Sequence, residues 1–356
     1  MHKQPLLWRL SHKHQILLIK QLAMLLRSGI PLLMALHILR DQHTKSKTLY
    51  LVMSQVADDV ENGQPLSAAL EKYKKVFGGL TVTMIAIGEI SGTLSDSLDH
   101  LAASLKKKQA LQHKLVAASV YPAFVVVATL AITVLLTVVI FPKIIPVFTS
   151  VHYRLPWTTR ALIVISAILQ HHLILVILLL VAVGAGIWLL LKLPTVRKGC
   201  EYVLLLMPFC RPLIQDYSLA TTFRTIGILI GSGTTAVQSI KITAGITTHP
   251  LYQQALDSIA NHVANGKKLS GGFSEFPKLF PVSVVHLIAV GESTGKLGET
   301  CLYLADHYEQ ELDELTKNLS ATVEPLLLIC MGLMVGFIAI AIITPIYGIT
   351  QHLNTR

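Results

Sequence analysis

The heptapeptide Gly-Glu-Ile-Ser-Gly-Thr-Leu at residues 88–94 returns 203 positions later, as Gly-Glu-Ser-Thr-Gly-Lys-Leu at residues 291–297. At the same offset Pro122, at the start of one apolar run, corresponds to Pro325, at the start of another. A single match of seven residues would carry little weight, but matches that keep one offset indicate a repeat. The chain is therefore a duplication of one long unit, in which a polar helical domain precedes a hydrophobic segment.

The composition is that of a membrane protein. Of the 356 residues, 52% are hydrophobic and only 14% are charged, which is too apolar for an ordinary soluble enzyme. Three apolar runs, at residues 121–140, 173–191 and 325–347, approach the roughly 20 residues that a helix needs to cross a bilayer. None of them contains an acidic or basic side chain, as expected where a charge at mid-membrane is costly.

The fold class follows from the spacing of apolar residues outside these runs, which is helical and nowhere alternates with a period of two for long. We expect an all-α membrane protein with two homologous cytoplasmic antiparallel helical bundles, of about six helices each, and three transmembrane helices. The expected segments are, in chain order, a first cytoplasmic helical domain at 1–116, transmembrane helix 1 at 117–141, an external loop and interfacial segment at 142–170, transmembrane helix 2 at 171–191, a second cytoplasmic helical domain at 192–319, transmembrane helix 3 at 320–348 and an external tail at 349–356.

The start of the second transmembrane helix has two interpretations. The apolar segment 161–169 is short and is followed directly by Gln-His-His at 170–172, which suggests an amphipathic or interfacial piece that leads into the second span. In the alternative, the second helix begins earlier and simply tilts in the membrane.

Basic residues near the ends of the spans predict the orientation, because they favour the cytoplasmic side. They gather before the first span and after the second, whereas the connection between these two spans has few. The gathered residues are Lys106, Lys107, Lys108, Lys114, Lys192, Arg197 and Lys198. The N-terminus and both helical domains should therefore be cytoplasmic, and the C-terminal tail should be external.

Each heptapeptide lies at the junction between the fifth and sixth expected helices of its domain. The candidate residues of these junctions are Gly88, Glu89, Gly92, Gly291, Glu292 and Gly295. The second glycine of each copy suits the left-handed conformation that ends a helix. The glutamate faces the unfavourable end of the helix dipole and should need a partner. It would either accept from the backbone N–H groups that open the sixth helix or pair with a lysine, which are structural roles, or contact another protein.

Proline stands at the entry of two spans, where Pro122 follows Tyr121 and Pro325 follows Glu324. Proline is tolerated early in a helix or where it kinks one. Glu324 is the only acidic residue that touches a span. It is either an interfacial carboxylate in the head-group layer or a contact with a neighbouring subunit or a substrate helix in the membrane.

The sequence argues against catalysis. It has no Ser-His-Asp or Cys-His arrangement, His171 and His172 lack a suitably spaced third ligand, and the four cysteines form no CxxC pair. The second heptapeptide departs from a phosphate loop, which needs four residues between its glycines and Ser or Thr after its lysine. We expect no catalytic residue, no metal and no cofactor. The net charge of +10 is better explained by topology and anionic lipid than by nucleic acid.

A small membrane transporter or channel is the alternative function. Such a protein would carry polar or ionisable groups inside its spans. The spans offer small residues and only a few hydroxyl groups, those of Thr129, Thr133, Thr137 and Thr344. A flux assay in vesicles would separate this alternative from a scaffold.

The order of these motifs resembles the inner-membrane platform proteins of type II secretion systems and type IV pili, the general secretion pathway protein F family. The resemblance extends over residues 16–349 and rests on the segment 21–36, both Gly-Glu-x-x-Gly-x-Leu copies, Tyr-Pro at 121–122, Pro-x-Phe at 146–148, Leu-Pro-x-Thr-Thr-Arg at 155–160 and Glu-Pro at 324–325. One departure is Thr-Thr at 234–235, where relatives usually have an apolar residue and proline.

The resemblance implies a multi-pass protein of the bacterial cytoplasmic (inner) membrane that does no chemistry of its own. Its implied partners are a hexameric assembly ATPase, pilin or pseudopilin subunits, other inner-membrane assembly proteins and further copies of the same chain. It would pass movement of the ATPase to pilins through a sixth helix that continues into the first span. Secretion, twitching, adhesion and DNA uptake all stay open as the process served.

Overall fold

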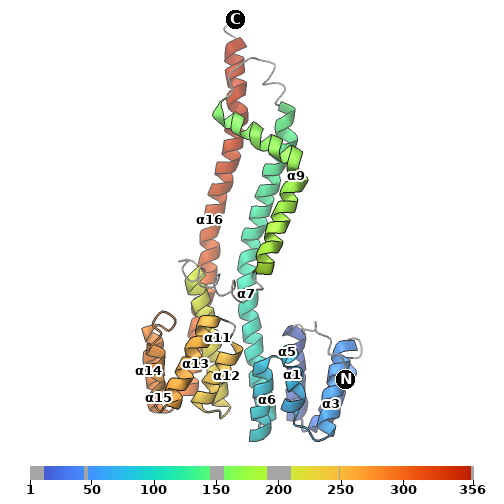
Figure 1. The fold of residues 1–356 in the computed structure, drawn as a ribbon, viewed down its shortest axis with the longest axis vertical. Coiled ribbons are helices and arrows are strands. Elements are labelled where there is room, and N and C mark those ends of the chain that lie inside the picture. The colour runs from blue at the N-terminus through green and yellow to red at the C-terminus, as the bar shows by residue number, and fades with distance from the viewer. Residues whose placement is uncertain (1–11, 44–46, 145–155, 191–209, 248, 354–356) are drawn as a thin grey trace. The chain divides into compact units, whose positions relative to one another are not determined.

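Every regular element of the described chain is a helix (Figure 1). The computed structural model describes residues 12–43, 47–144, 156–190, 210–247 and 249–353. The chain divides into two compact units, one made of residues 1–113 with 207–313 and the other of residues 114–206 with 314–356. The first unit contains the two polar helical domains and the second contains the apolar segments. The expected all-α class is confirmed for the described residues.

The first repeat forms a bundle of short helices that ends in a long one. Its helices are α1 (His12–Arg27), α2 (Leu32–Gln42), α3 (Lys47–Glu61), α4 (Leu66–Glu71), α5 (Lys74–Phe77), α6 (Gly79–Ser91) and α7 (Leu94–Leu135). Leu18 and Leu22 of α1 are buried one helical turn apart, as the apolar spacing predicts. The short α5 between the expected fourth and fifth helices was not expected from the sequence.

The second repeat follows the same plan. Its helices are α11 (Cys210–Gly231), α12 (Ala236–Ile246), α13 (Pro250–Ala264), α14 (Leu269–Ser274), α15 (Val282–Thr294) and α16 (Leu297–Leu353). Left-handed glycines end helices at equivalent places in the two repeats, and the equivalent pairs are Gly29 with Gly233, Gly63 with Gly266 and Gly92 with Gly295. The duplication seen in the sequence is therefore also a duplication of helices and chain reversals.

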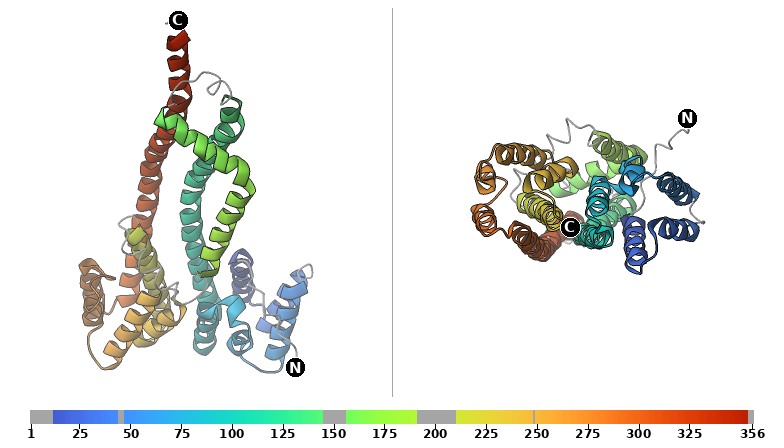
Figure 2. Two further views of the ribbon diagram at one scale, coloured as in Figure 1. Left: turned by 45° about the horizontal axis from the view of Figure 1, so that its top comes forward. Right: turned by 90° about the horizontal axis from the view of Figure 1, so that it is seen from below.

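The two repeats pack against each other inside the first unit, and the two views of Figure 2 show their helices as adjacent groups, blue and yellow to orange. Leu229 of α11 is fully buried within the hydrophobic core of the first repeat. Ile228 and Ile242 of the second repeat pack against the same core, and α12 lies against α6. We call this contact between the first repeat's core and the α11–α12 side of the second repeat the seam.

The second unit contains the rest of α7 and α16 together with α9 (Trp157–Leu190). Among the described residues, the helices long and apolar enough to cross a membrane are Leu94–Ile144 and Leu297–Thr344. The first contains the first predicted span, and the second contains most of the third. The second predicted span lies within α9 and stays a prediction.

Helix α9 packs on both of the other long helices. The Ser166 hydroxyl donates to the carbonyl of Thr137 at 2.8 Å, and Thr137 lies in a π-helical turn, η1 (Leu136–Ile140), that follows α7. The Thr159 hydroxyl donates to the carbonyl of Ala341 in α16, also at 2.8 Å. These bonds satisfy hydroxyl groups inside an otherwise apolar unit.

Two helix boundaries bear on the expected segments. Helix α9 begins at Trp157, so residues 161–169 form its first part, and the helix bends instead of breaking (Figure 1). This finding favours the alternative of an earlier start over a separate interfacial piece. Helix α16 continues to Leu353, so most of the expected tail is helical. Parts of the expected N-terminal domain, external loop, second domain and tail lie outside the described residues, namely 1–11, 44–46, 145–155, 191–209, 248 and 354–356.

Candidate functional site

Glu89 caps a short helix of its own repeat. One carboxylate oxygen accepts from the backbone N–H of Leu66 at 2.5 Å and the other from that of Ser67 at 2.9 Å. These are the first two residues of α4, and Pro65 before them provides no side-chain cap. The first N–H groups of a helix have no partner within the helix and carry its positive dipole end, so a carboxylate is well suited to them.

Glu292 does the same in the second repeat. Its carboxylate accepts from the backbone N–H of Leu269 at 2.7 Å and of Ser270 at 3.2 Å, and from the Ser270 hydroxyl at 3.1 Å. Lys268 precedes α14 and provides no side-chain cap. Both glutamates therefore replace a local N-cap by a carboxylate that is distant in sequence.

Backbone N–H groups at a helix start donate to these glutamates, as in the first alternative, but the helix is not the expected one. The donors belong to the fourth helix of each repeat, α4 or α14, and not to the sixth. A helical side chain leans towards the N-terminus of its helix. Glu89 near the end of α6 therefore reaches back towards α4, away from the start of α7.

The glycines of the heptapeptides allow a very tight turn. A Cβ atom on Gly88 would lie 2.9 Å from the Cα of Leu94 and from Ser97, and one on Gly291 would lie 2.6 Å from the Thr300 hydroxyl. The second glycines, Gly92 and Gly295, both have φ of +71°, in the left-handed region that glycine adopts at no steric cost. The first glycine thus lets two helices touch, and the second ends a helix as expected.

The proline and glutamate candidates lie together in the second unit. The Tyr121 hydroxyl donates to Glu324 at 3.2 Å, which joins α7 to α16 beside Pro122 and Pro325. Both prolines lie in the interior of their long helices, well after the helix starts. Proline at an interior position removes one backbone hydrogen bond and favours a kink. Glu324 contacts the chain's own Tyr121, and its contact with other subunits stays a prediction.

A cluster of charged side chains, which the sequence did not reveal, crosses the seam. Arg224 of α11 donates to Asp306 at 2.5 Å and to Glu309 at 2.6 and 3.1 Å, and Lys107 of α7 donates to Asp306 at 2.7 Å. The side chain of Arg224 is only 9% exposed. We call these four residues the seam charge cluster, and it ties the long helices of the two repeats to each other.

Burial and hydrogen bonding compete in this cluster. Burial acts to raise the pKa of Asp306, but the hydrogen bonds from Arg224 and Lys107 outweigh it, and the pKa lies below its usual value. Burial likewise acts to lower the pKa of Arg224, and its bonds to Asp306 and Glu309 outweigh this effect and raise it. The charged forms of these groups are therefore favoured in the folded protein.

The sequence does contain a signal for this cluster. Lys107 lies in the run Lys106 to Lys108 of α7, and the equivalent residues of α16, 309–311, read Glu-Gln-Glu. Opposite charges at equivalent positions of two homologous helices are expected where those helices attract each other.

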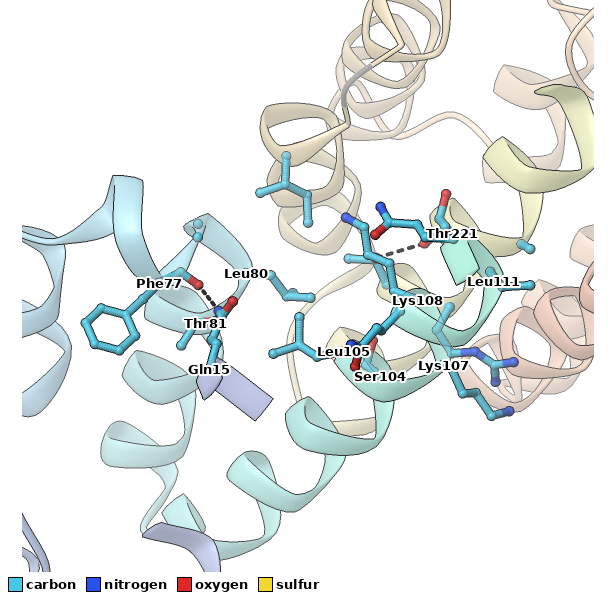
Figure 3. A pocket seen from close by; sticks show the side chains of 18 of the residues that line it. Gln15, Phe77, Leu80, Thr81, Ser104, Leu105, Lys107, Lys108, Leu111 and Thr221 are labelled. Carbon is cyan, nitrogen blue, oxygen red and sulfur yellow. Dashed lines mark hydrogen bonds between the residues drawn. The ribbon is translucent and has the colours of Figure 1, made fainter. Parts of the chain in front are cut away.

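A cavity of about 270 Å³ opens at the seam beside this cluster (Figure 3). Its wall includes Lys107 and Lys108 of α7 and Thr221 of α11. Gln15 also lines it and donates to the carbonyl of Phe77 and, at 3.1 Å, to the Thr81 hydroxyl. Burial lowers the pKa of Lys108. Among the described residues no group of His, Cys, Asp and Glu is arranged to hold a metal ion.

Comparison with known proteins reproduces the duplication. The family model described as type II secretion system (T2SS), protein F matches the chain twice, at residues 18–142 and 222–345. Each match contains one heptapeptide and all or most of one long apolar segment. They cover well over half of the chain.

Individual relatives come from two kinds of machine. The type IV pilus assembly protein PilC of Thermus thermophilus is 32% identical over 337 residues, which cover 95% of this chain and 82% of that protein. The type II secretion system protein F of Aeromonas hydrophila is 31% identical over 340 residues, 95% of this chain and 87% of that protein. The PilC protein of Myxococcus xanthus is 30% identical over 330 residues, 93% of this chain and 79% of that protein. The chain belongs to the type II secretion system protein F family.

Proposed function

We propose that the protein is a non-enzymatic inner-membrane platform of a type II secretion or type IV pilus machine. It couples a cytoplasmic assembly ATPase to the extraction and assembly of pilin or pseudopilin subunits. The observation that carries the proposal is the continuity of α7 and α16, each of which runs without interruption from a polar bundle into an apolar segment. A continuous helix transmits displacement or rotation along its length better than a flexible linker does.

The seam supports the same function. A part that receives force from a motor must move as one body, and the two repeats share buried apolar residues and the seam charge cluster. The ATPase docks on the repeats, pilin subunits contact the apolar segments, and other inner-membrane assembly proteins surround them. The relatives carry the names of pilus assembly and secretion proteins, which supports these classes of partner.

A helix-breaking substitution tests the coupling directly. Ala117 is an exposed residue of α7 that follows the bundle. Ala117→Pro removes a backbone hydrogen bond and destabilises the helix there by about 3 kcal/mol. We expect it to abolish secretion or pilus assembly while the protein still inserts and still co-purifies with the ATPase.

Ala117→Ser is the matched control, because it keeps the backbone bond and changes little volume. It should leave assembly intact. Normal assembly with Ala117→Pro, in protein that is inserted and bound to the ATPase, would refute transmission through α7. Failure of the unaltered chain to co-purify with the ATPase would instead refute the docking itself.

A further inference from the structure

The seam joins two different faces of two similar repeats. On the first repeat it uses α6, and on the second it uses α12 and the end of α11. The closeness is such that a Cβ atom on Gly79 of α6 would lie 3.0 Å from the side chain of Ile246 of α12. Two homologous modules that meet through different faces form a head-to-tail, or heterologous, interface. Each repeat therefore has one face in the seam and also a left-over face, which is equivalent to the face that the other repeat uses in the seam.

The left-over faces follow from the equivalence of the helices. Helices α2 and α12 have 11 residues each and follow the equivalent residues Pro31 and Thr235. Helices α6 and α15 have 13 residues each and end at the equivalent glycines Gly92 and Gly295. The first repeat thus carries an α1–α2 face equivalent to the α11–α12 face of the seam. The second repeat carries an α15 face equivalent to the α6 face.

Both left-over faces expose apolar side chains at the positions that are covered in the seam. On α15, Val282 is 64% exposed and Val290 is 57% exposed, whereas the equivalent residues of α6, Gly79 and Ile87, are partly buried. Large exposed aliphatic residues on one side of a helix indicate a surface that another protein covers.

The α1–α2 face has the same property. Leu17 is 48% exposed and Met24 is 60% exposed, and they lie seven residues apart on one side of α1. Their equivalents in α11, Thr221 and Ile228, are both partly buried, and Ile228 packs at the seam.

We propose that the α15 face of one copy of this chain binds the α1–α2 face of another copy, in the way that the two repeats bind inside one chain. The partner is a second copy of this chain, because the exposed α1–α2 face of that copy is homologous to the α11–α12 face. Within one chain, the α11–α12 face already packs against α6, the homologue of α15. This interface is heterologous, so repeated docking builds a ring where the rotation closes and an open row where it does not.

The contact between copies lacks the carboxylates, and hence the ion pairs, of the seam. The residues equivalent to Asp306 and Glu309 are Ala103 and Lys106, and the residue equivalent to Lys107 is Gln310. The seam charge cluster therefore has no counterpart between copies. We expect a mainly apolar contact that is weaker than the seam and that forms and separates without unfolding either repeat.

Cysteine cross-linking between two differently tagged full-length chains tests the proposal. The pair Gln42 and Val282 is the equivalent of the close pair Ile246 and Gly79. A parent chain without cysteine, made by replacing Cys200, Cys210, Cys301 and Cys330 with alanine, receives Gln42→Cys in one copy and Val282→Cys in the other. We expect a short bifunctional maleimide to join the two tags in membranes. The pair Gly79→Cys and Ile246→Cys within one chain verifies the reagent.

The controls distinguish a head-to-tail contact from a two-fold symmetric one. Either single variant alone should give no cross-linked dimer, since a head-to-tail contact never brings the same residue of two copies together. Leu51→Cys, exposed on α3 outside both faces, should not cross-link to Val282→Cys. Efficient dimers of Gln42→Cys with itself would show a two-fold symmetric interface and overturn the proposal. No cross-link between the tags, or an equal yield with Leu51→Cys, would overturn it too.

A second measurement needs no cysteine. Val290→Glu places a charge on the α15 face and should reduce co-purification of two tagged copies about tenfold. Ile90→Glu is the matched control, because Ile90 is exposed near the end of α6 and lies outside both faces. Equal co-purification of the two variants would mean that another protein covers the α15 face, and the proposal would fall.

Discussion

Glu89 and Glu292 show how a single side chain can stabilise a short helix of its bundle. Each carboxylate accepts hydrogen bonds from two backbone N–H groups at the start of a helix only six residues long. A helix of that length does not hold itself in water, because helix nucleation is unfavourable. The glutamate therefore stabilises α4 or α14 from outside, and the tight glycine turn beside it places the carboxylate.

Replacing Glu89 by glutamine tests this role. Glutamine keeps one acceptor oxygen but turns an amino group towards an N–H donor, and the charge that favours the helix start is lost. We expect Glu89→Gln to lower the free energy of unfolding by about 1–2 kcal/mol. Thermal unfolding of the full chain in detergent, followed by circular dichroism, measures it.

Glu61→Gln is the control for that experiment, since Glu61 is exposed at the end of α3. It should shift the unfolding midpoint little. Glu292→Gln should behave like Glu89→Gln. Equal midpoints for Glu61→Gln and Glu89→Gln would show that the two backbone contacts contribute nothing to stability.

Asp216 should make the stability of the protein depend on pH. Burial raises its pKa to about 6, the Glu311 carboxylate adds to the rise, and His307 opposes it. The folded protein therefore binds a proton that the unfolded chain releases, so ionised Asp216 destabilises the fold at neutral pH. We expect Asp216→Asn to stabilise the protein by about 1 kcal/mol at pH 7, after allowance for solvent screening.

The sign is checked by repeating the unfolding at lower pH. The stabilisation by Asp216→Asn should be full above about pH 6. It should shrink as the pH falls from about 6 to the ordinary pKa of 3.8, and vanish below that value. An effect of Asp216→Asn that does not change with pH would refute the proton linkage.

At the scale of elements, α7 and α16 are held in place by charge as well as by apolar packing. The guanidinium of Arg224 lies between carboxylates of α16, and Asp306 also reaches Lys107 of α7. Such a group of charges is stable as a whole and costly to break, because removal of Arg224 leaves Glu309, which is only 18% exposed, with Lys107 at 3.8 Å as its remaining ion-pair partner in the cluster. This contrasts with exposed pairs such as Arg40 with Asp41, which contribute little.

Arg224→Met removes the charge and keeps most of the volume. We expect it to lower the free energy of unfolding by about 2 kcal/mol at pH 7. Because the folded pKa of Asp306 is depressed, its stabilisation is present above its ordinary pKa of 3.8 and is lost as the pH falls through the lower folded value. The cost of the substitution should therefore shrink in acid. Arg40→Met is the control and should change stability by less than about 0.5 kcal/mol at any pH; an equal loss in both variants contradicts the special role of the cluster.

The sequence predicted local features of these elements better than it predicted which residues contact each other. The turn at Gly92 follows from neighbouring residues, since the φ of a glycine at a helix end is a local property. The acceptor role of Glu89 was also predicted, but its donors in α4 were not, because they depend on how α6 packs in three dimensions. The seam charge cluster joins residues more than 80 positions apart, so its pairs could not be read from neighbouring residues, and only a comparison of the two repeats shows the opposite charges of α7 and α16. The start of α9 at Trp157 was left open between two interpretations, because the polar residues at 170–172 interrupt the apolar run.

At the scale of the whole molecule, the seam limits the membrane topology. Leu229 of the second repeat is buried in the core of the first, and we therefore propose that the two repeats lie on the same side of the bilayer. The chain between them, residues 114–206, must then cross the membrane an even number of times or not at all. In this proposal the apolar end of α7, which lies in a helix long and apolar enough to cross a membrane, makes one crossing, and α9 makes the other. This parity agrees with the three expected spans, of which the second stays a prediction.

Labelling with a membrane-impermeant maleimide tests this topology in spheroplasts of a strain that makes the cysteine-free chain. Leu51→Cys reports on the first repeat and Lys267→Cys on the second, and both residues are exposed. We predict that neither reacts until the membrane is permeabilised, because the basic residues that flank the bundles retain them in the cytoplasm. Val151→Cys, in the expected external loop, should react in intact spheroplasts and serves as the control for access. Reaction of both bundle sites from outside would reverse the orientation but keep the parity. Reaction of only one would mean that the repeats lie on opposite sides, which is incompatible with a shared core and with a platform that offers both bundles to one motor.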